Sequence, residues 1–360
     1  MGQCCCAVIS RRTFLRAMGV GAIALALPNP VFGESPQEAA RRLIERYAAD
    51  RQEPWLVMHG VRALGRGFSL GDVSAVDYLL TNDVRAKDIN GTPYLYVPRE
   101  VEGHTSVALK TLLEAGVPRE KDIRVEGGRY HLNDLAEGAK ALLTFDPRSF
   151  DKDDLAWSLI AFSELRAEEW TNAYGQKVRL KDLVAFGFET IEEATRGMGP
   201  YAAGNRPLPQ KFPIHRFTCG GTHSAYSLVA AARHGYAGAY RRTLQEQLDL
   251  MVYRLWADVD LIDRFYAGLP SGPWEEANRL EAKLKFTGHA FEVLHYAKRH
   301  AIFTPTSAQK ARMEEGLAAL YRIFSAVAAL DLKMVKVRDR SLYSLFIGDL
   351  CHAYRGVRLA

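Results

Sequence analysis

Five histidines stand beside small residues, each just inside a predicted helix start, at widely separated points of the sequence: His59, His104, His223, His289 and His352. Imidazole titrates near neutral pH and is a common metal ligand, so it suits both proton transfer and metal binding. Any one of these histidines can equally be a structural side chain that bonds a nearby carbonyl. Their recurrence in similar surroundings favours a shared site.

Carboxylates accompany two of these histidines. Glu102 comes two residues before His104, and Glu292 comes one helical turn after His289. A glycoside hydrolase needs paired carboxylates, whereas a lyase needs a base such as histidine and a group that neutralises a carboxylate. We therefore predict catalytic roles first for His223, His289 and Glu292, and next for His59, His104 and Glu102.

Two cysteines add a candidate zinc site. Cys219 lies four residues before His223, so the two share a face if both are helical, and Cys351 directly precedes His352. Thiolate and imidazole are the ligands that zinc takes in tetrahedral sites. The alternatives are that Cys219 is a small buried side chain, or that it forms a disulfide with Cys351 after export.

Two loops carry aromatic and polar side chains just before helices that contain a candidate residue. The loop 197–217 is longer than most connections and rich in Gly and Pro, which is typical of a lid, although it could also simply seal the fold. From these loops we predict the ligand-binding residues Tyr94, Tyr96 and Arg99 in 90–103, and Tyr201, Asn205, Arg206 and His215 in 197–217.

These residues must be positioned by helices. Amphipathic patterns predict an N-terminal helix near 35–50 and helices near 72–82, 131–144, 180–196, 239–259 and 307–330. They alternate with six helices rich in small residues, five carrying the histidines and one carrying Trp157. We predict an all-α fold over 34–360 as one domain, an α/α toroid of about six helical hairpins with an inner and an outer ring.

A short pattern recurs three times ahead of the amphipathic helices. GRGFSLGDV at 65–73, GGRYHLNDL at 127–135 and GQKVRLKDL at 175–183 each place glycine before an alternating apolar stretch and an aspartate. Glycine permits a tight reversal, and alternation is typical of a short strand. The pattern predicts short connections that resemble β-hairpins.

The strings TCGGTHSAYSLVAA and TGHAFEVLHYA resemble inner-helix starts of α/α toroids of the squalene cyclase and prenyltransferase type. The resemblance implies the fold more than the function. It does not extend to the acidic Asp-x-Asp-Asp motif, since DVDLIDR at 258–264 lacks adjacent aspartates. DLCHAYRGV is similar to the Cys-His-Gly zinc motif of lanthionine cyclases, with Ala353 in place of the glycine.

The first 33 residues resemble a twin-arginine export signal. Arg11 and Arg12 are followed by Phe14 and Leu15, and then by an apolar run too short to span a bilayer. The resemblance implies recognition by the twin-arginine export machinery, export of the folded protein and a periplasmic location. An uncleaved anchor is the alternative, while cleavage would leave a mature chain without an integral membrane span.

Charge and cysteine content bear on two further classes, nucleic-acid-binding proteins and disulfide-rich proteins. The formal net charge is +5, and residues 1–33 carry three arginines and no acid, which leaves +2 for 34–360. Nothing in this balance indicates a nucleic-acid partner. Three of the five cysteines also lie in 1–33, so a disulfide framework is not expected.

Taken together, the sequence predicts an exported toroid that binds or processes a small polar or sugar-like ligand in a histidine-lined central cavity. Zinc is the candidate cofactor, and hydrolase and lyase are the candidate enzyme classes. The alternative is a noncatalytic interaction subunit of an envelope assembly. An enzyme should bring several ionisable side chains to one cavity, whereas a scaffold should show a large exposed apolar patch.

Overall fold

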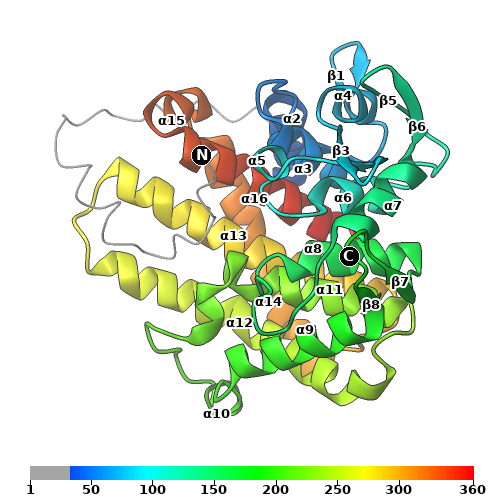
Figure 1. Cartoon of the computed structure of the whole chain (residues 1–360). Coiled ribbons are helices and arrows are strands. Elements are labelled where there is room, and N and C mark those ends of the chain that lie inside the picture. The colour runs from blue at the N-terminus through cyan, green and yellow to red at the C-terminus, as the bar shows by residue number, and fades with distance from the viewer. Residues whose placement is uncertain (1–32) are drawn as a thin grey trace.

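The structure is a computed structural model that describes residues 33–360, so the predicted signal segment lies almost wholly outside it. The described part is mostly helical, which confirms the all-α class (Figure 1). The helices are α2 (Pro36–Tyr47), α3 (Pro54–Leu64), α4 (Ala75–Asn82), α5 (Arg99–Glu102), α6 (Val107–Glu114), α7 (Leu132–Leu142), α8 (Leu155–Leu165), α9 (Leu180–Thr195), α10 (Gly199–Ala203), α11 (Thr222–Arg233), α12 (Arg241–Ala267), α13 (Pro273–Arg299), α14 (Ser307–Ala328), α15 (Leu332–Arg338) and α16 (Arg340–Arg358).

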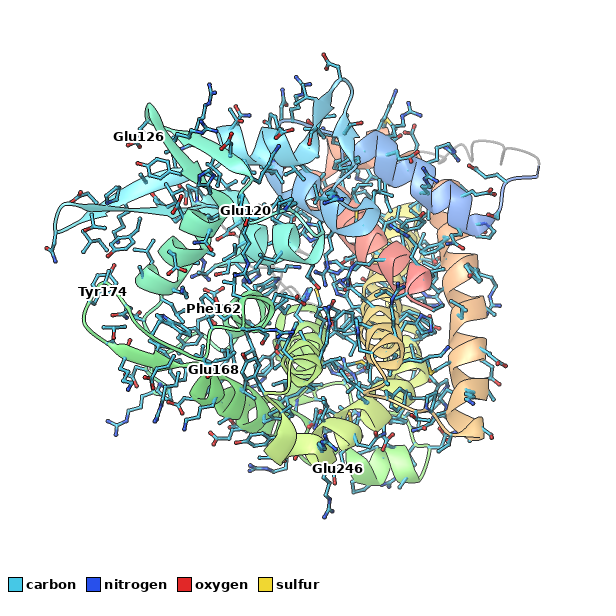
Figure 2. The ribbon with its side chains drawn as sticks, turned by 90° about the vertical axis from the view of Figure 1, so that its right-hand side faces the viewer. Glu120, Glu126, Phe162, Glu168, Tyr174 and Glu246 are labelled. Carbon is cyan, nitrogen blue, oxygen red and sulfur yellow. The ribbon has the colours of Figure 1, made fainter. Side chains whose placement is uncertain are left out.

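Short antiparallel hairpins connect several helices, as the recurring pattern predicted. They are β1 (Ser69–Leu70) with β2 (Val73–Ser74), β3 (Arg85–Ile89) with β4 (Thr92–Tyr96), β5 (Asp122–Val125) with β6 (Gly128–His131), and β7 (Glu169–Thr171) with β8 (Lys177–Arg179). The β3–β4 pair falls where we expected a loop. In Figure 2, Glu126 and Tyr174 mark the tips of two hairpins at the edge of the molecule, while Phe162 on α8 lies further in.

Six helices contact one another in a closed circuit. In order, α3 packs on α6, α6 on α8, α8 on α11, α11 on α13 and α13 on α16, and α16 packs back on α3. The start and the end of the described chain therefore lie side by side (Figure 1). These six include every predicted small-residue helix, and they carry the buried groups discussed below.

Six further helices pack on members of this circuit. α2 packs on α16 and α14, α4 on α3, α7 on α6, α9 on α8, and α12 and α14 on α13. Most of their bounds agree closely with the predicted amphipathic segments, but α12 continues to Ala267, two turns beyond the predicted end at 259. The helix α13 begins about four turns before the segment predicted around His289. Across residues 33–360, none of the helices combines the length and apolar character that crossing a membrane requires.

Glycine allows α13 and α16 to approach very closely. A Cβ atom built on Gly288 would lie 2.5 Å from Cβ of Ala353, and one built on Gly356 would lie 2.7 Å from the backbone nitrogen of Glu292. These distances are far below normal contact. Gly288, the small residue beside His289, is therefore required by the packing of these two helices.

Replacing Gly356 by alanine should destabilise the protein, because the added methyl group meets backbone that cannot move aside. We expect a loss of about 1–3 kcal/mol in the free energy of unfolding, measured by urea unfolding followed by circular dichroism. Gly199→Ala is the matched control, since a Cβ there meets nothing within 4 Å. Equal stability of the two variants would show that α13 and α16 are not in such close contact.

Candidate functional site

Four of the five predicted histidines come together at the centre of the helix circuit. We call His59, His223, His289 and His352 the histidine cluster. Ring centroids are 4.0 Å apart for His289 and His352, 4.7 Å for His223 and His289, and 5.1 Å for His352 with either His59 or His223. Each residue is at most 8% exposed. Four helices of the circuit thus bring residues from distant points of the chain into direct ring contact.

Contrary to our prediction, most of these histidines do not lie just inside helix starts. Only His223 does so, on α11, whereas His59 is in the middle of α3 and His289 and His352 are in the second halves of α13 and α16. The cluster therefore lies at mid-depth in the circuit and not at a mouth. Its rings are packed against one another and do not line an open central cavity.

Hydrogen bonds fix the orientation of three of these rings. His59 Nδ1 donates to the carbonyl of Trp55 (2.7 Å), His352 Nδ1 donates to Glu292 (2.7 Å), and His289 Nε2 donates to Asp349 (2.9 Å). Each bond places the ring proton on one nitrogen and leaves a lone pair on the other. This is how metal-binding histidines are usually held, with one N–H on a carboxylate or carbonyl.

Burial keeps the cluster uncharged. It lowers the pKa of His59 and His289 to about 3, and it lowers the pKa values of His223 and His352 well below 6.5, where neighbouring histidines add to the effect. Neutral imidazole is the form that ligates metals. The four rings are consequently poor proton donors at neutral pH but available as ligands.

Cys219 reaches the cluster from an irregular segment and not from a helix. It adopts left-handed backbone angles (φ 49°, ψ 36°), followed by left-handed Gly220 and Gly221. Our assumption that Cys219 and His223 share a helical face is therefore wrong, although the two still come together. A left-handed conformation is unfavourable for cysteine and is concentrated at functional sites in proteins.

Cys219, His223 and His289 form one of two groups that could hold a metal ion. One potential ligand atom from each residue lies within 4.8 Å of the other two. Lys285 lies close to this group, because Cys219 contributes, after Glu281 and Asp349, to raising the pKa of the Lys285 ammonium group. The sequence had predicted Cys219, His223, Cys351 and His352 for such a site but not His289.

Cys351 does not join either metal-binding group of the described residues. It is fully buried within the hydrophobic core, and burial raises the pKa of its thiol well above 9.0. Adjacent helical residues point in different directions, so the side chain of Cys351 diverges from that of His352. Within residues 33–360 neither Cys219 nor Cys351 is in a disulfide, so the predicted alternative pairing is absent there.

The second group, formed by His289, Glu292 and His352, has its carboxylate already engaged. Glu292 accepts hydrogen bonds from His352, from Arg62 Nε (2.9 Å) and from Arg355 Nη1 (2.7 Å). Burial alone would raise its pKa, but Arg62, His352 and Arg355 together lower it well below 4.5. Glu292 is therefore an ionised anchor of the cluster and not the proton donor that a hydrolase would need.

A buried ionic network extends from Glu292 toward the carboxyl ends of the helices. Glu114 pairs with Arg62 and Arg355 and accepts a hydrogen bond from Tyr226 (2.5 Å), and its pKa falls to about 2 because these arginines outweigh burial. Lys110 lies 3.7 Å from Glu114, and burial, together with Arg62, lowers its pKa to about 7. Within this network the two arginines balance the two glutamates, Glu114 and Glu292.

Sequence reasoning missed Arg62, Glu114 and Arg355. A signal was present, because Arg62 and Arg355 follow His59 and His352 by three residues, just as Tyr226 and Glu292 follow His223 and His289. Residues three apart lie on the same face of a helix. The recurring spacing therefore points to a second layer of polar side chains beneath the histidines.

His104 belongs to a neighbouring arrangement and is bridged to the cluster by Trp157. Its ring stacks on Trp157 (3.9 Å between centroids), which in turn contacts His223 (5.0 Å), and its Nδ1 bonds Asp154 (2.9 Å). The predicted ligand-binding Arg99 pairs with the same aspartate (3.0 Å), which lines a cavity of about 340 Å³. These residues form a separate polar site beside α8.

Glu102 has a structural role. Its carboxylate accepts the backbone N–H groups of Ser106 (3.0 Å) and Ala108 (2.9 Å) at the start of α6, and burial raises its pKa to about 8. Such contacts satisfy the unpaired donors of a helix N-terminus. It does not face Glu292 as a catalytic pair.

The other predicted ligand-binding residues lie away from the cluster. Tyr94 and Tyr96 are on strand β4, opposite Lys87 and Arg85.

The long loop 197–217 packs against outer helices. Arg206 stacks on Tyr201, Asn205 accepts from Arg312 of α14 (2.8 Å), and buried His215 bonds Asp258 of α12 (2.9 Å). The interpretation that this loop seals the fold agrees better with these contacts than a lid does.

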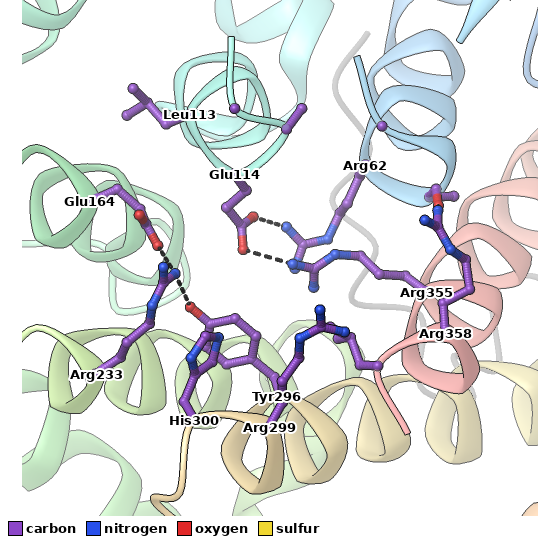
Figure 3. Close-up of a pocket in the computed structure, with 15 residues that line it drawn as sticks. Arg62, Leu113, Glu114, Glu164, Arg233, Tyr296, Arg299, His300, Arg355 and Arg358 are labelled. Carbon is purple, nitrogen blue, oxygen red and sulfur yellow. Dashed lines mark hydrogen bonds and ion pairs between the residues drawn. The ribbon is translucent and has the colours of Figure 1, made fainter. Parts of the chain in front are cut away.

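The larger cavity, of about 470 Å³, opens where all six helices of the circuit reach their carboxyl ends. Figure 3 shows charged side chains converging there from each of these helices, with Glu114 joined to Arg62 and Arg355, and Arg233 joined to Glu164 and Tyr296. Arg62, Glu114 and Arg355 belong to both this cavity and the network that holds Glu292.

No family model, curated protein or solved structure matches this chain.

Proposed function

We propose that the chain is an α/α toroid, with the six helices of the closed circuit as its inner ring and the attached helices as its outer ring. The contact between α16 and α3, which closes the circuit, supports this arrangement. So do the contacts of α2, α4, α7, α9, α12 and α14 with the outside of the same six helices. The resemblance of the α11 and α13 sequences to inner helices of squalene cyclase-type toroids agrees with this assignment.

We propose further that the centre of this toroid binds zinc on Cys219, His223 and His289. The carrying observation is that their ligand atoms lie within 4.8 Å of one another, on buried neutral rings, one of which is fixed by Asp349. Tetrahedral zinc holds its ligands about 3.5 Å apart, so the three groups need to move inward by about 1 Å at most. The ring of His352 lies beside this group, with centroid distances of 4.0 Å to His289 and 5.1 Å to His223, and is the candidate fourth ligand.

A metal here suits metal-assisted processing of a small polar or sugar-like ligand by hydrolysis or elimination. When bound, zinc supplies Lewis-acid polarisation of an oxygen or an activated water. Asp349 holds His289 in the tautomer that a metal needs, and Glu292 does the same for His352. The convergence of ionisable groups favours an enzyme over a scaffold; in the described residues the exposed large apolar side chains are few: Tyr174, Trp256, Met334 and Val337.

Export by the twin-arginine route into the periplasm is consistent with this proposal. That route carries folded proteins, so a buried metal could be acquired before translocation. The arginine pair that carries this proposal lies outside the described residues.

Metal analysis of the purified mature protein tests the zinc site. We expect about one equivalent of zinc by inductively coupled plasma mass spectrometry, and its loss in Cys219→Ala and His223→Ala variants whose circular dichroism is unchanged. Cys351→Ala is the matched control, since it removes the other buried cysteine, and it should keep the metal.

Two results would contradict the zinc site. One is a wild-type protein that takes up no zinc, cobalt or copper even after dialysis against each ion. The other is equal zinc loss in Cys219→Ala and Cys351→Ala, which would indicate loss of structure and not loss of a ligand. If zinc does bind, an assay with chromogenic glycosides or esters tests the proposed hydrolysis. We expect metal-dependent cleavage that is absent in His223→Ala.

A further inference from the structure

The cavity at the carboxyl ends of the inner helices carries an excess of positive charge. Only two of its lining residues, Glu114 and Glu164, are acidic. Five arginines line it, each from the last turns of an inner helix: Arg62, Arg233, Arg299, Arg355 and Arg358. A cation at the end of one helix is explained by the helix dipole, but that effect does not require five guanidinium groups around one space.

The carboxylates balance only part of this charge, even though Glu292 beneath the lining also pairs with Arg62 and Arg355. Glu164 is committed to Arg233 (2.8 Å), and Glu114 pairs with both Arg62 and Arg355. In residues 33–360 no ion pair involves Arg299 or Arg358, and the latter donates only to the carbonyl of Ala63 (2.6 Å). The guanidinium groups at the rim therefore have no carboxylate partner of their own.

A buried donor beneath the rim is also without a hydrogen bond. Arg62 is 6% exposed and lines the cavity, and its Nη2 atom is buried without a hydrogen-bond partner among the described residues. Its other nitrogens serve Glu114 and Glu292. Buried donors are normally satisfied, so this group indicates a partner that the protein itself does not provide.

The lowered pKa of His300 is consistent with the same excess of positive charge. His300 lies on the cavity wall just after α13, and burial, followed by the charges of Arg233 and Arg299, lowers the pKa of its ring. A positive potential that disfavours a sixth cation should favour an anion. Nearby Tyr296 narrows one side of the space and is held by Arg233 (2.9 Å).

We propose that this cavity binds a small organic anion carrying at least two phosphate or carboxylate groups. Its volume, about 470 Å³, falls in the usual range for small-molecule sites. Guanidinium groups bind phosphate and carboxylate through paired hydrogen bonds, and Arg299 and Arg358 at the rim have donors to offer. Arg355 and Arg62 form the floor, beyond which Glu292 connects them to His352.

This proposal does not rest on the zinc site. The anion would touch the carboxyl-end cavity, whereas the zinc ligands lie on the far side of Glu292. The two are nevertheless linked through Arg62 and Arg355, because both arginines hold the glutamate that orients His352. Either site can be absent without removing the observations that support the other.

Isothermal titration calorimetry on the mature protein at low salt tests the anion site. Pyrophosphate and citrate are the probes that separate a phosphate from a carboxylate ligand, and maltose is a neutral probe of similar size. We expect one of the two anions to bind at a single site, and Arg299→Gln and Arg358→Gln each to weaken binding about tenfold. Binding should also raise the pKa of the His300 ring, followed by nuclear magnetic resonance.

Arg242→Gln on α12 is the matched control, because Arg242 is an exposed arginine that does not line the cavity. It should leave binding unchanged. The proposal is wrong if neither anion binds, if maltose binds as tightly as the anions, or if Arg242→Gln weakens binding as much as Arg299→Gln. Unfolding midpoints of both rim variants should match the wild type, which separates lost contacts from lost structure.

Discussion

Replacing Glu292 by glutamine should cost about 3–5 kcal/mol in the free energy of unfolding, the largest effect we expect from a single side chain here. The carboxylate of Glu292 is buried and accepts hydrogen bonds from Arg62, Arg355 and His352 at once. Glutamine has the same shape but no charge, so two buried guanidinium groups would share only Glu114. Guanidinium chloride unfolding followed by circular dichroism measures the loss.

A surface pair provides the control for this prediction. Glu45 bonds Arg41 one turn away on α2 in an exposed position, and Glu45→Gln should change stability by no more than about 0.5 kcal/mol. Adding Arg355→Met to Glu292→Gln should cost less than the sum of the single effects, because the second change removes a charge that the first left unpaired. If Glu292→Gln unfolds like the Glu45 variant, the network is not what holds the helices of the circuit together.

The pH dependence of stability should respond strongly to His59. Its pKa is about 3 in the folded protein, because the ring is buried, and about 6.5 in the unfolded chain. Between these values the unfolded state binds the extra proton, so the folded state loses stability as pH falls through this window. Each unit of pH within this window changes the free energy of unfolding by about 1.4 kcal/mol. His59→Phe removes this contribution while keeping a ring against Trp55.

Unfolding free energies of the metal-free proteins at pH 7 and pH 4 test this expectation. The difference between His59→Phe and the wild type should move in favour of the variant by about 3 kcal/mol on acidification. All other groups titrate in both proteins and largely cancel. His131→Phe changes an exposed ring on β6 and should show no comparable shift. Parallel pH profiles for His59→Phe and the wild type would mean that the His59 ring is already accessible to protons.

The helices were largely predictable because most of them are amphipathic, with one apolar and one polar face. The amphipathic segments near 180–196 and 307–330 correspond to α9 (Leu180–Thr195) and α14 (Ser307–Ala328). The hairpins followed from glycine and alternation, except β3–β4, whose second strand contains proline and reads as a loop. The early start of α13 was missed because its first turns are mostly polar and therefore resemble a connecting segment.

The site was predictable in its residues more than in its geometry. His223 and His289 were recognised from small neighbours, but those neighbours reflect the tight packing of Gly288 on Ala353, which a helix start does not require. The position of Cys219 could not be derived from four-residue spacing, because its left-handed backbone breaks the helix before α11. Glu102 was predicted to be catalytic because it lies close to His104 in the sequence. A carboxylate that accepts hydrogen bonds from backbone amides, as Glu102 does, has no distinct sequence signature.

The closure of the helix circuit has a consequence for how the chain acquires its fold. Arg62 bonds Glu292 across 230 residues of sequence, and Arg358 bonds the carbonyl of Ala63 across 295. Contacts this remote form slowly, because a long stretch of chain must be ordered before they are made. Until α16 docks, Glu292 lacks Arg355 and His352, and the apolar flanks of α3 and α13 remain open. The docking of α16 therefore converts an incomplete, aggregation-prone intermediate into the native state, and a chaperone that delays the release of α16 would protect the chain during that interval.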